Sequence, residues 1–243
     1  MRQPLLALPL LLLAVACDPA PSAPRRVEAP SPVAMAAPTE TTPAAPSAPT
    51  STDELATRGE VILVPLGQPF PEDVLDAIEG SLRDELQVEV TRHERLPLPR
   101  AAYYRPRKRY RADKLLDHLL ERFPEIPPTT RVLGLTTTDI STTKGKHQDW
   151  GIFGLGLVPG QAAVVSIHRL RRGAKDRAQL RNRAAITAIH EVGHTFGLDH
   201  CPEELCPMQD AEGSITNTDT STGHLGPSCR TTLDARFPLR DTP

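Results

Sequence analysis

The 243-residue sequence lacks several features that would assign it to a class at once. Its formal net charge is only −2, so the chain as a whole has no electrostatic attraction for nucleic acid. After the first seventeen residues, no apolar run approaches the roughly 20 residues that a membrane-spanning helix needs. No internal repeat is visible, which is evidence against a repeat architecture. Cysteine is also scarce, with four residues in the whole chain.

The N-terminal segment resembles a bacterial lipoprotein signal sequence. Arg2 precedes an apolar run that ends in small residues before Cys17, and this run is too short for a stable membrane anchor. We expect a signal peptide over 1–16, lipid attachment to Cys17, and secretion to the periplasm or the cell exterior. An ordinary signal peptide followed by an incidental cysteine is the alternative.

Two segments of different composition follow the signal peptide. Residues 17–55 are mostly Pro, Ala, Ser and Thr with few large apolar groups, so we expect a disordered tether. Residues 56–243 are long enough for one domain with its own core. Nearby acids dilute the basic run 105–114, which we interpret as a solvated surface. We therefore expect a monomer that has no nucleic-acid partner and reaches the membrane only through its lipid.

Apolar periodicity predicts alternating strands and helices in the domain. Strands are predicted at 60–67, 87–94 and 130–137, and helices at 71–86, 112–123 and 176–196. Two β-rich runs, 150–160 and 161–170, meet at a Pro-Gly pair and predict a hairpin or adjacent edge strands. The alternation predicts an α/β (α+β) fold with a mixed, twisted sheet.

Three histidines lie close together in the stretch "HEVGHTFGLDH". His190 and His194 are spaced i and i+4, which places both imidazoles on one face of a helix, where they can bind one ion. Gly197 can adopt a positive φ and end the helix, so that the chain returns His200 to the same ion. Three imidazoles with an open fourth position are typical of a catalytic zinc site.

Glu191 lies between the first two histidines, turned about 100° around the helix axis. A zinc ion lowers the pKa of a bound water from about 15.7 toward 7. We expect Glu191 to act as general base toward that water and as acid toward a leaving amine, which predicts peptide or amide hydrolysis. Two alternatives stay open: a metal-binding lipoprotein without turnover, and a zinc amidase that acts on cell-wall peptides.

The longer stretch "HEVGHTFGLDHCPEELCPM" resembles the archaemetzincins, metzincin-type zinc metallopeptidases with the motif HExxHxxGxxHC followed by CxM and CxxC. The resemblance extends upstream through "YYRPRKRYRADKLL" and "AAVVSIHRL" and covers most of residues 60–236. It implies a metzincin-like fold with an active-site helix, acting on peptide substrates. It also implies individual roles: catalytic zinc ligands at His190, His194 and His200, general base at Glu191, and a Met-turn at Met208.

The same resemblance implies a second, structural zinc held by four cysteines. Cys201 and Cys206 match the first pair and Cys229 matches the last position, but residue 226 is Gly. Other groups could supply the fourth ligand, namely His224, Asp210 or a water molecule. A disulfide between Cys201 and Cys206 is an open alternative outside the cytoplasm, as is no bond at all.

Overall fold

The computed structural model describes residues 56–210 and 213–240, so the expected signal peptide, Cys17 and tether lie outside the described residues. Within the described ranges, no helix combines the length and apolar character needed to cross a membrane. The strands are β1 (Glu60–Leu66), β2 (Glu89–Arg92), β3 (Tyr103–Tyr104), β4 (Arg109–Arg111), β5 (Thr130–Thr136), β6 (Ile140–Lys144), β7 (His147–Ile152), β8 (Gly154–Gly156) and β9 (Ala162–Ser166). The α-helices are α1 (Glu72–Leu86), α2 (Ala112–Arg122), α3 (Ile167–Leu170), α4 (Arg177–Thr195), α5 (Thr216–Thr220) and α6 (Pro227–Arg236).

The described strands form two sheets. The larger has the order β2-β1-β5-β9-β8, in which β8 runs antiparallel to β9 and the other pairs are parallel. The α/β class and the mixed sheet expected from the sequence are confirmed. The smaller sheet has the order β3-β4-β6-β7 and was not predicted, because its strands are short or polar, as in "ISTTK" and "HQDWGI".

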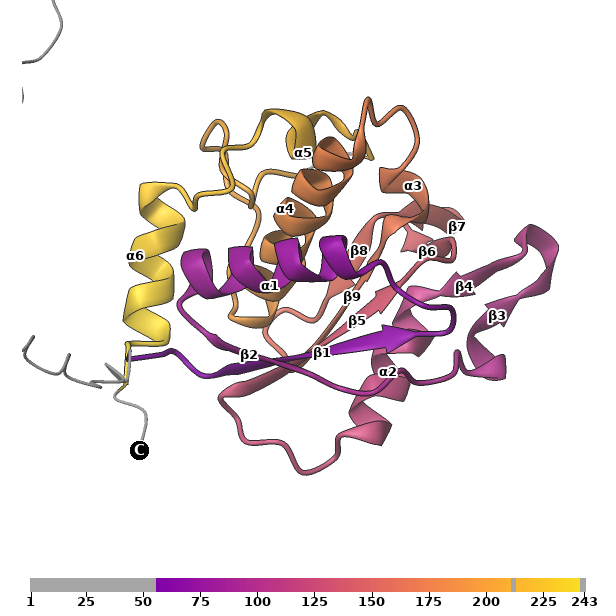
Figure 1. The fold of residues 1–243 in the computed structure, drawn as a ribbon, viewed down its shortest axis with the longest axis horizontal. Helices are drawn as coiled ribbons and strands as arrows, with labels where there is room; N and C mark the ends of the chain where they lie inside the picture. Colours follow the sequence, from indigo (N-terminus) through magenta and orange to yellow (C-terminus); the bar gives the residue numbers. More distant parts are fainter. Residues whose placement is uncertain (1–55, 211–212, 241–243) are drawn as a thin grey trace, which may run out of the picture. The chain divides into compact units, whose positions relative to one another are not determined.

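Helices cover both faces of the larger sheet, with α1 and α4 on one face and α2 on the other (Figure 1). Successive residues of β9 show why both faces are apolar. Ala163 and Val165 belong to the core under α1 and α4, whereas Ala162 and Val164 belong to the core under α2. A strand that is buried on both faces has the continuous apolar sequence seen in "AAVV".

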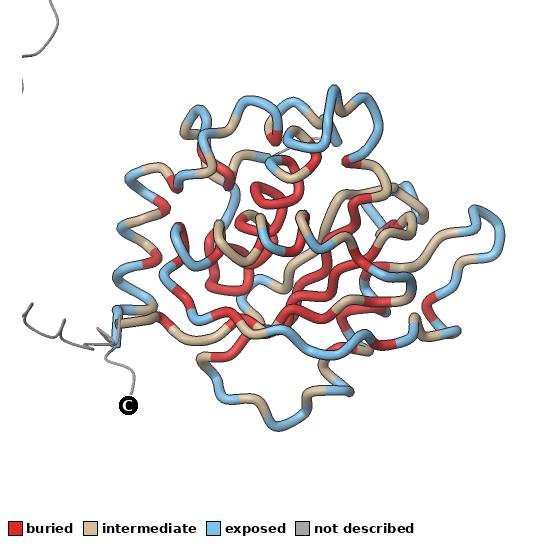
Figure 2. Tube along the Cα trace, viewed as in Figure 1, coloured by how far each residue is buried: buried red, intermediate tan, exposed pale blue. Residues whose placement is uncertain are grey.

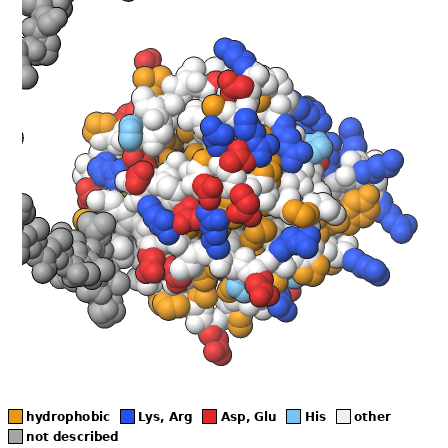
Figure 3. All heavy atoms as spheres, viewed as in Figure 1, with side chains coloured by type: hydrophobic (Ala, Val, Ile, Leu, Met, Phe, Trp, Pro, Cys, Tyr) orange, Lys and Arg blue, Asp and Glu red, His pale blue; other side chains and the backbone are white. Residues whose placement is uncertain are grey.

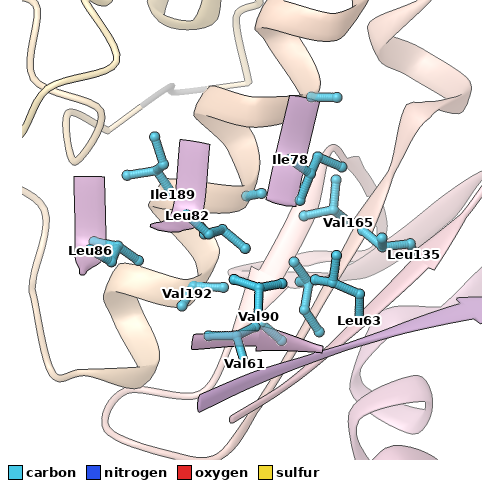
Figure 4. Packing of buried hydrophobic residues seen from close by; sticks show 14 of the residues in the cluster. Val61, Leu63, Ile78, Leu82, Leu86, Val90, Leu135, Val165, Ile189 and Val192 are labelled. Carbon is cyan, nitrogen blue, oxygen red and sulfur yellow. The ribbon is translucent and has the colours of Figure 1, made fainter. Parts of the chain in front are cut away.

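The core between α1 and α4 fixes the helix that carries the three-histidine motif. Ile78 and Leu82 of α1 belong to one buried cluster with Ile189 and Val192 of α4 and Leu135 of β5 (Figure 4). Each of these five side chains is at most 1% exposed. Burying an aliphatic side chain of this size contributes about 1.5–3 kcal/mol, so α4 is held firmly in place. Figure 2 shows that α4 is buried along much of its length.

The structure confirms the predicted helices and corrects part of the strand prediction. α1, α2 and α4 agree with the predicted helices to within one residue at each end. The expected hairpin exists as β8 and β9, but these strands are shorter than the predicted runs. β8 ends at Gly156 and β9 ends at Ser166. Residues 150–152 belong to β7 in the smaller sheet, and residues 167–170 form α3. Ser166 starts α3 by accepting a hydrogen bond from the backbone N–H of His168 at 3.2 Å.

Charges of both signs are interspersed on the surface near α1 (Figure 3). Arg92 bonds to Asp76 and Glu79 of this helix at 2.6 Å each. The basic run 105–114 supplies β4 and leads into α2, and its Arg109 lies 3.3 Å from carboxylates on both Asp139 and Asp149. Acidic partners therefore compensate part of this run.

Candidate metal centre and active-site cleft

His190 and His194 face one another at the C-terminal end of α4. Their Nδ1 atoms donate hydrogen bonds to the carbonyl oxygens of Pro207 and Leu198, each at 2.7 Å. Because a carbonyl can only accept, both protons are on Nδ1, and the Nε2 lone pairs are free to bind a cation. The two Nε2 atoms are 3.1 Å apart, close to the roughly 3.3 Å between two nitrogens on a tetrahedral zinc.

Gly197 ends the helix as its sequence position predicted. Its φ is 78°, and it donates a hydrogen bond to the carbonyl of His194 at 2.8 Å, while Leu198 donates to that of Gly193 at 3.1 Å. This pair of bonds is a Schellman motif, which reverses the chain after the last helical turn. The reversal brings His200 to the other two histidines, so that the ligand atoms of all three lie within 4.8 Å of one another.

Burial keeps the two helical imidazoles neutral. It lowers the pKa of His190 to about 3, assisted by the neighbouring His194, and also lowers the pKa of His194. A neutral imidazole is the form that binds a metal ion. His200 differs because its side chain is 46% exposed and lies 3.6 Å from a carboxylate oxygen of Asp210. Two ligands are therefore largely enclosed, and the third lies exposed at the rim.

Glu191 is buried beside the histidines. Burial raises the pKa of its carboxyl group to about 8, although a hydrogen bond from the backbone N–H of Gly156 opposes this shift. The carboxyl group lies against β8, where a Cβ atom on Gly154 would be only 2.6 Å from Oε1. A Cβ atom on Gly156 would overlap the backbone oxygen of Glu191. Both glycines are needed for β8 to approach α4 this closely.

Gly154 and Gly156 were not recognised from the sequence as parts of the site. The sequence did contain a signal for them, because glycines inside a predicted strand often mark a place where another group approaches the backbone closely. Gly193, inside α4, was also not recognised from the sequence. A Cβ atom there would lie 2.7 Å from Sδ of Met208, so this glycine lets the methionine pack against α4 between the two histidines. Met208 is fully buried.

A cleft of about 430 Å³ opens over this group of residues. The end of β7 and all of β8 line one side of it, and α4 supplies the histidines and Glu191. Other lining residues give it a mixed, mainly apolar surface: Trp150, Phe153, Val158, Ile186, Thr187 and Asn217. The space next to the histidines is therefore open to a ligand larger than water.

Comparisons with known proteins agree with this geometry. Peptidase family M54 matches the chain over residues 65–235. The archaemetzincin of Methanopyrus kandleri is 35% identical over 140 residues, covering 58% of this chain and 75% of that protein. The archaemetzincin of Haloquadratum walsbyi is 28% identical over 180 residues, covering 71% and 98%. The crystal structure of the Methanopyrus kandleri protein aligns with a TM-score of 0.63 at 32% identity, covering 73% of this chain and 94% of that one.

The chain belongs to peptidase family M54. It is an archaemetzincin zinc metallopeptidase, a hydrolase, as the resemblance implied. The three histidines form the site of the catalytic zinc, and their donor set and spacing fit that ion. The alternative of a metal-binding protein without turnover is thereby set aside.

This archaemetzincin has a second group of metal-binding side chains. The Sγ atoms of Cys201, Cys206 and Cys229 lie within 4.8 Å of one another, and those of Cys206 and Cys229 are 3.9 Å apart. Thiolates on a tetrahedral zinc are about 3.8 Å apart, so the group fits a second zinc. All three are free thiols, and the disulfide considered from the sequence is not present.

The structure does not bring His224 to the three thiols. Its Nδ1 donates to a carboxylate oxygen of the buried Glu85 at 2.8 Å, and the rest of its side chain is largely exposed. Asp210 lies next to His200, with a carboxylate oxygen 3.6 Å from Nδ1 of that histidine. Neither residue joins the group of three cysteines, so the sequence-based candidates for a fourth protein ligand are not supported by the geometry.

Proposed function

We propose that the chain hydrolyses peptide bonds in its cleft, with His190, His194 and His200 as ligands of the catalytic zinc and Glu191 as general base and acid. One observation carries the assignment of the base. A buried carboxyl group with an elevated pKa lies next to three convergent imidazoles and opens onto the cleft. A zinc ion in this site supplies Lewis-acid activation of a water molecule and a carbonyl.

The surroundings of Glu191 suit a group that takes up and returns a proton. Its burial favours the protonated form, so it accepts a proton from an attacking water more readily than an exposed carboxylate would. The N–H of Gly156 restrains the carboxylate and keeps one oxygen oriented. The same group then donates the proton to the leaving amine, which completes the hydrolysis.

An extended peptide is the substrate shape that the cleft favours. β8 is the last strand in the order of the larger sheet, and all three of its residues line the cleft. The free edge of a strand can bind an extended chain through backbone hydrogen bonds, which impose little side-chain selectivity. The apolar part of the lining, including Phe153 and Ile186, then accommodates substrate side chains.

A peptide-library digest with the full zinc-loaded chain tests this proposal. Glu191→Ala should retain its zinc and lose about 10²–10⁴-fold in hydrolysis rate, the usual contribution of general acid–base catalysis. The control is Glu121→Ala, on the exposed surface of α2, which should behave as wild type. Equal activity in wild type and Glu191→Ala would refute the mechanism. Cleavage of purified cell wall without cleavage of the library would favour the amidase.

We also propose that the enzyme is secreted and held at a membrane by lipid on Cys17, with residues 17–55 as its tether. The support is the sequence alone, since an apolar run leads through small residues to that cysteine. Labelled palmitate should enter the wild-type protein in a bacterial host, and Cys17→Ser should be unlabelled and soluble. Unlabelled wild-type protein in the soluble fraction would exclude the anchor.

A further inference from the structure

The loop before α6 contains a glycine that its backbone does not require. Gly226 has φ −63° and ψ 160°, a conformation that any residue adopts without strain. Its backbone N–H points at the thiol group, donating to Sγ of Cys206 at 3.2 Å. A side chain on residue 226 would therefore begin next to that sulfur, and some other feature must explain why none is present.

The carboxyl group of Glu203 fills the space where that side chain would start. A Cβ atom on residue 226 would overlap Oε2 of Glu203 and lie 2.8 Å from its Cδ atom. The other oxygen, Oε1, accepts a hydrogen bond from the backbone N–H of Ser228 at 3.0 Å, in the first turn of α6. Glycine at 226 and glutamate at 203 are thus sterically linked, although they are distant in sequence.

Glu203 also lies in the short loop that joins two of the thiols. It follows Cys201 by two residues and precedes Cys206 by three, and its carbonyl accepts a hydrogen bond from the N–H of Cys206 at 3.4 Å. Its side chain is partly buried, and Oε2 occupies the space next to residue 226, whose backbone N–H reaches Sγ of Cys206. The neighbouring Glu204, in contrast, is exposed.

We propose that Glu203 is the fourth protein ligand of a zinc ion held by Cys201, Cys206 and Cys229. Carboxylate oxygen is an accepted zinc ligand, and three thiolates with one carboxylate give the same formal charge as four thiolates. In the described part of the chain, the group of ligand atoms within 4.8 Å of one another at this site consists of the three thiols alone. Oε2 joins them by rotation of the Glu203 side chain, which Gly226 leaves room for. This inference is independent of the proposed catalytic mechanism.

Cobalt binding to the full chain tests the proposal, because only the cysteine site gives the near-ultraviolet charge-transfer band of cobalt thiolates. Glu203→Gln keeps an acceptor for Ser228 and so preserves the helix contact, but it loses the anionic ligand. We expect this variant to weaken metal binding at the cysteine site by at least about tenfold in a chelator competition. Glu204→Gln is the matched control and should bind as wild type.

A second variant separates ligation from a purely structural role. In the double variant Glu203→Ala, Gly226→Cys, the carboxylate is removed from the space that the new side chain needs. A fourth thiolate should then restore the affinity and increase the charge-transfer band by about one third, in proportion to the number of sulfurs. Gly226→Cys alone should gain less, because the carboxylate still competes for the space.

Three outcomes would overturn the proposal. The first is cobalt affinity of Glu203→Gln within about twofold of wild type, which would make water or another group the fourth ligand. The second is an X-ray absorption spectrum of the wild-type chain, with metal loaded at the cysteine site alone, that shows the multiple scattering of an imidazole beside the sulfurs. The third is a wild-type chain whose three cysteines bind no metal and react freely with a thiol reagent.

Discussion

Gly154→Ala should damage catalysis by moving Glu191 while leaving the zinc ligands intact. The new methyl carbon would lie 2.6 Å from Oε1 and 2.7 Å from Cδ of Glu191. Ordinary contacts between such atoms begin near 3.4 Å, so the carboxyl group or β8 must move by roughly 0.8 Å. A displacement of about 1 Å in a catalytic group can cost about 10²-fold in rate, equivalent to about 2.7 kcal/mol in the barrier.

The assay combines kcat on a cleaved peptide with the zinc content and the unfolding midpoint of each variant. Gly154→Ala should lose about a hundredfold in kcat, with one zinc retained on the histidines. Gly80→Ala is the control, because its methyl group contacts nothing within 4 Å on α1. It should leave kcat unchanged and add about 0.5–1 kcal/mol to stability. Kinetics of Gly154→Ala within about threefold of wild type would refute the reasoning, as would zinc loss in parallel with activity.

Three further perturbations test other parts of the structure. Phe196→Ala removes a fully buried ring that packs edge-on against Phe237, and it should cost about 3–5 kcal/mol in denaturant unfolding. Asp219→Asn removes the carboxylate that pairs with Arg183, and this pairing lowers the pKa of Asp219. The stabilisation is fully present above the unfolded pKa near 3.9, so the variant should be about 1.5–3 kcal/mol less stable at pH 7, and the difference should shrink as the pH falls below 3.9. Zinc removal by a chelator should abolish hydrolysis, and zinc addition should restore it. In the metal-free chain, burial lowers the pKa of His190, so the unfolded state binds more protons below about pH 6.5 and stability should fall as the pH falls below that value.

Local sequence signals were sufficient for the helix that carries the site. The i, i+4 spacing of His190 and His194, and Gly197 after them, specify a helical pair followed by a chain reversal. The observed φ of 78° at Gly197 and the position of His200 follow from those signals. The apolar runs of β1, β5 and β9 were equally readable, because strands buried on both faces have continuous apolar sequences.

Features that depend on distant contacts could not be predicted in this way. The smaller sheet has no apolar alternation, and its pairing is visible only once β4 lies next to β6. The alternate glycines of β8 are visible in the sequence, but the group that approaches Gly154 is identified only once α4 lies against β8. Likewise, Gly226 looked like a missing ligand until the fold brought Glu203 into the same space. Spacing along the chain contains no information about which distant side chain fills a gap.

The loop between the two metal-binding groups connects their geometries. His190 donates to the carbonyl of Pro207, and Cys201, the residue after His200, donates to the carbonyl of Met208 at 3.0 Å. The N–H of Met208 in turn contacts Sγ of Cys206 at 3.4 Å. His190 and His194 are oriented by a buried helix, but His200 has no such support and is half exposed. These contacts join the backbone next to the third histidine to the loop that carries Cys206 and Met208, so the two metal-binding groups share one segment of chain.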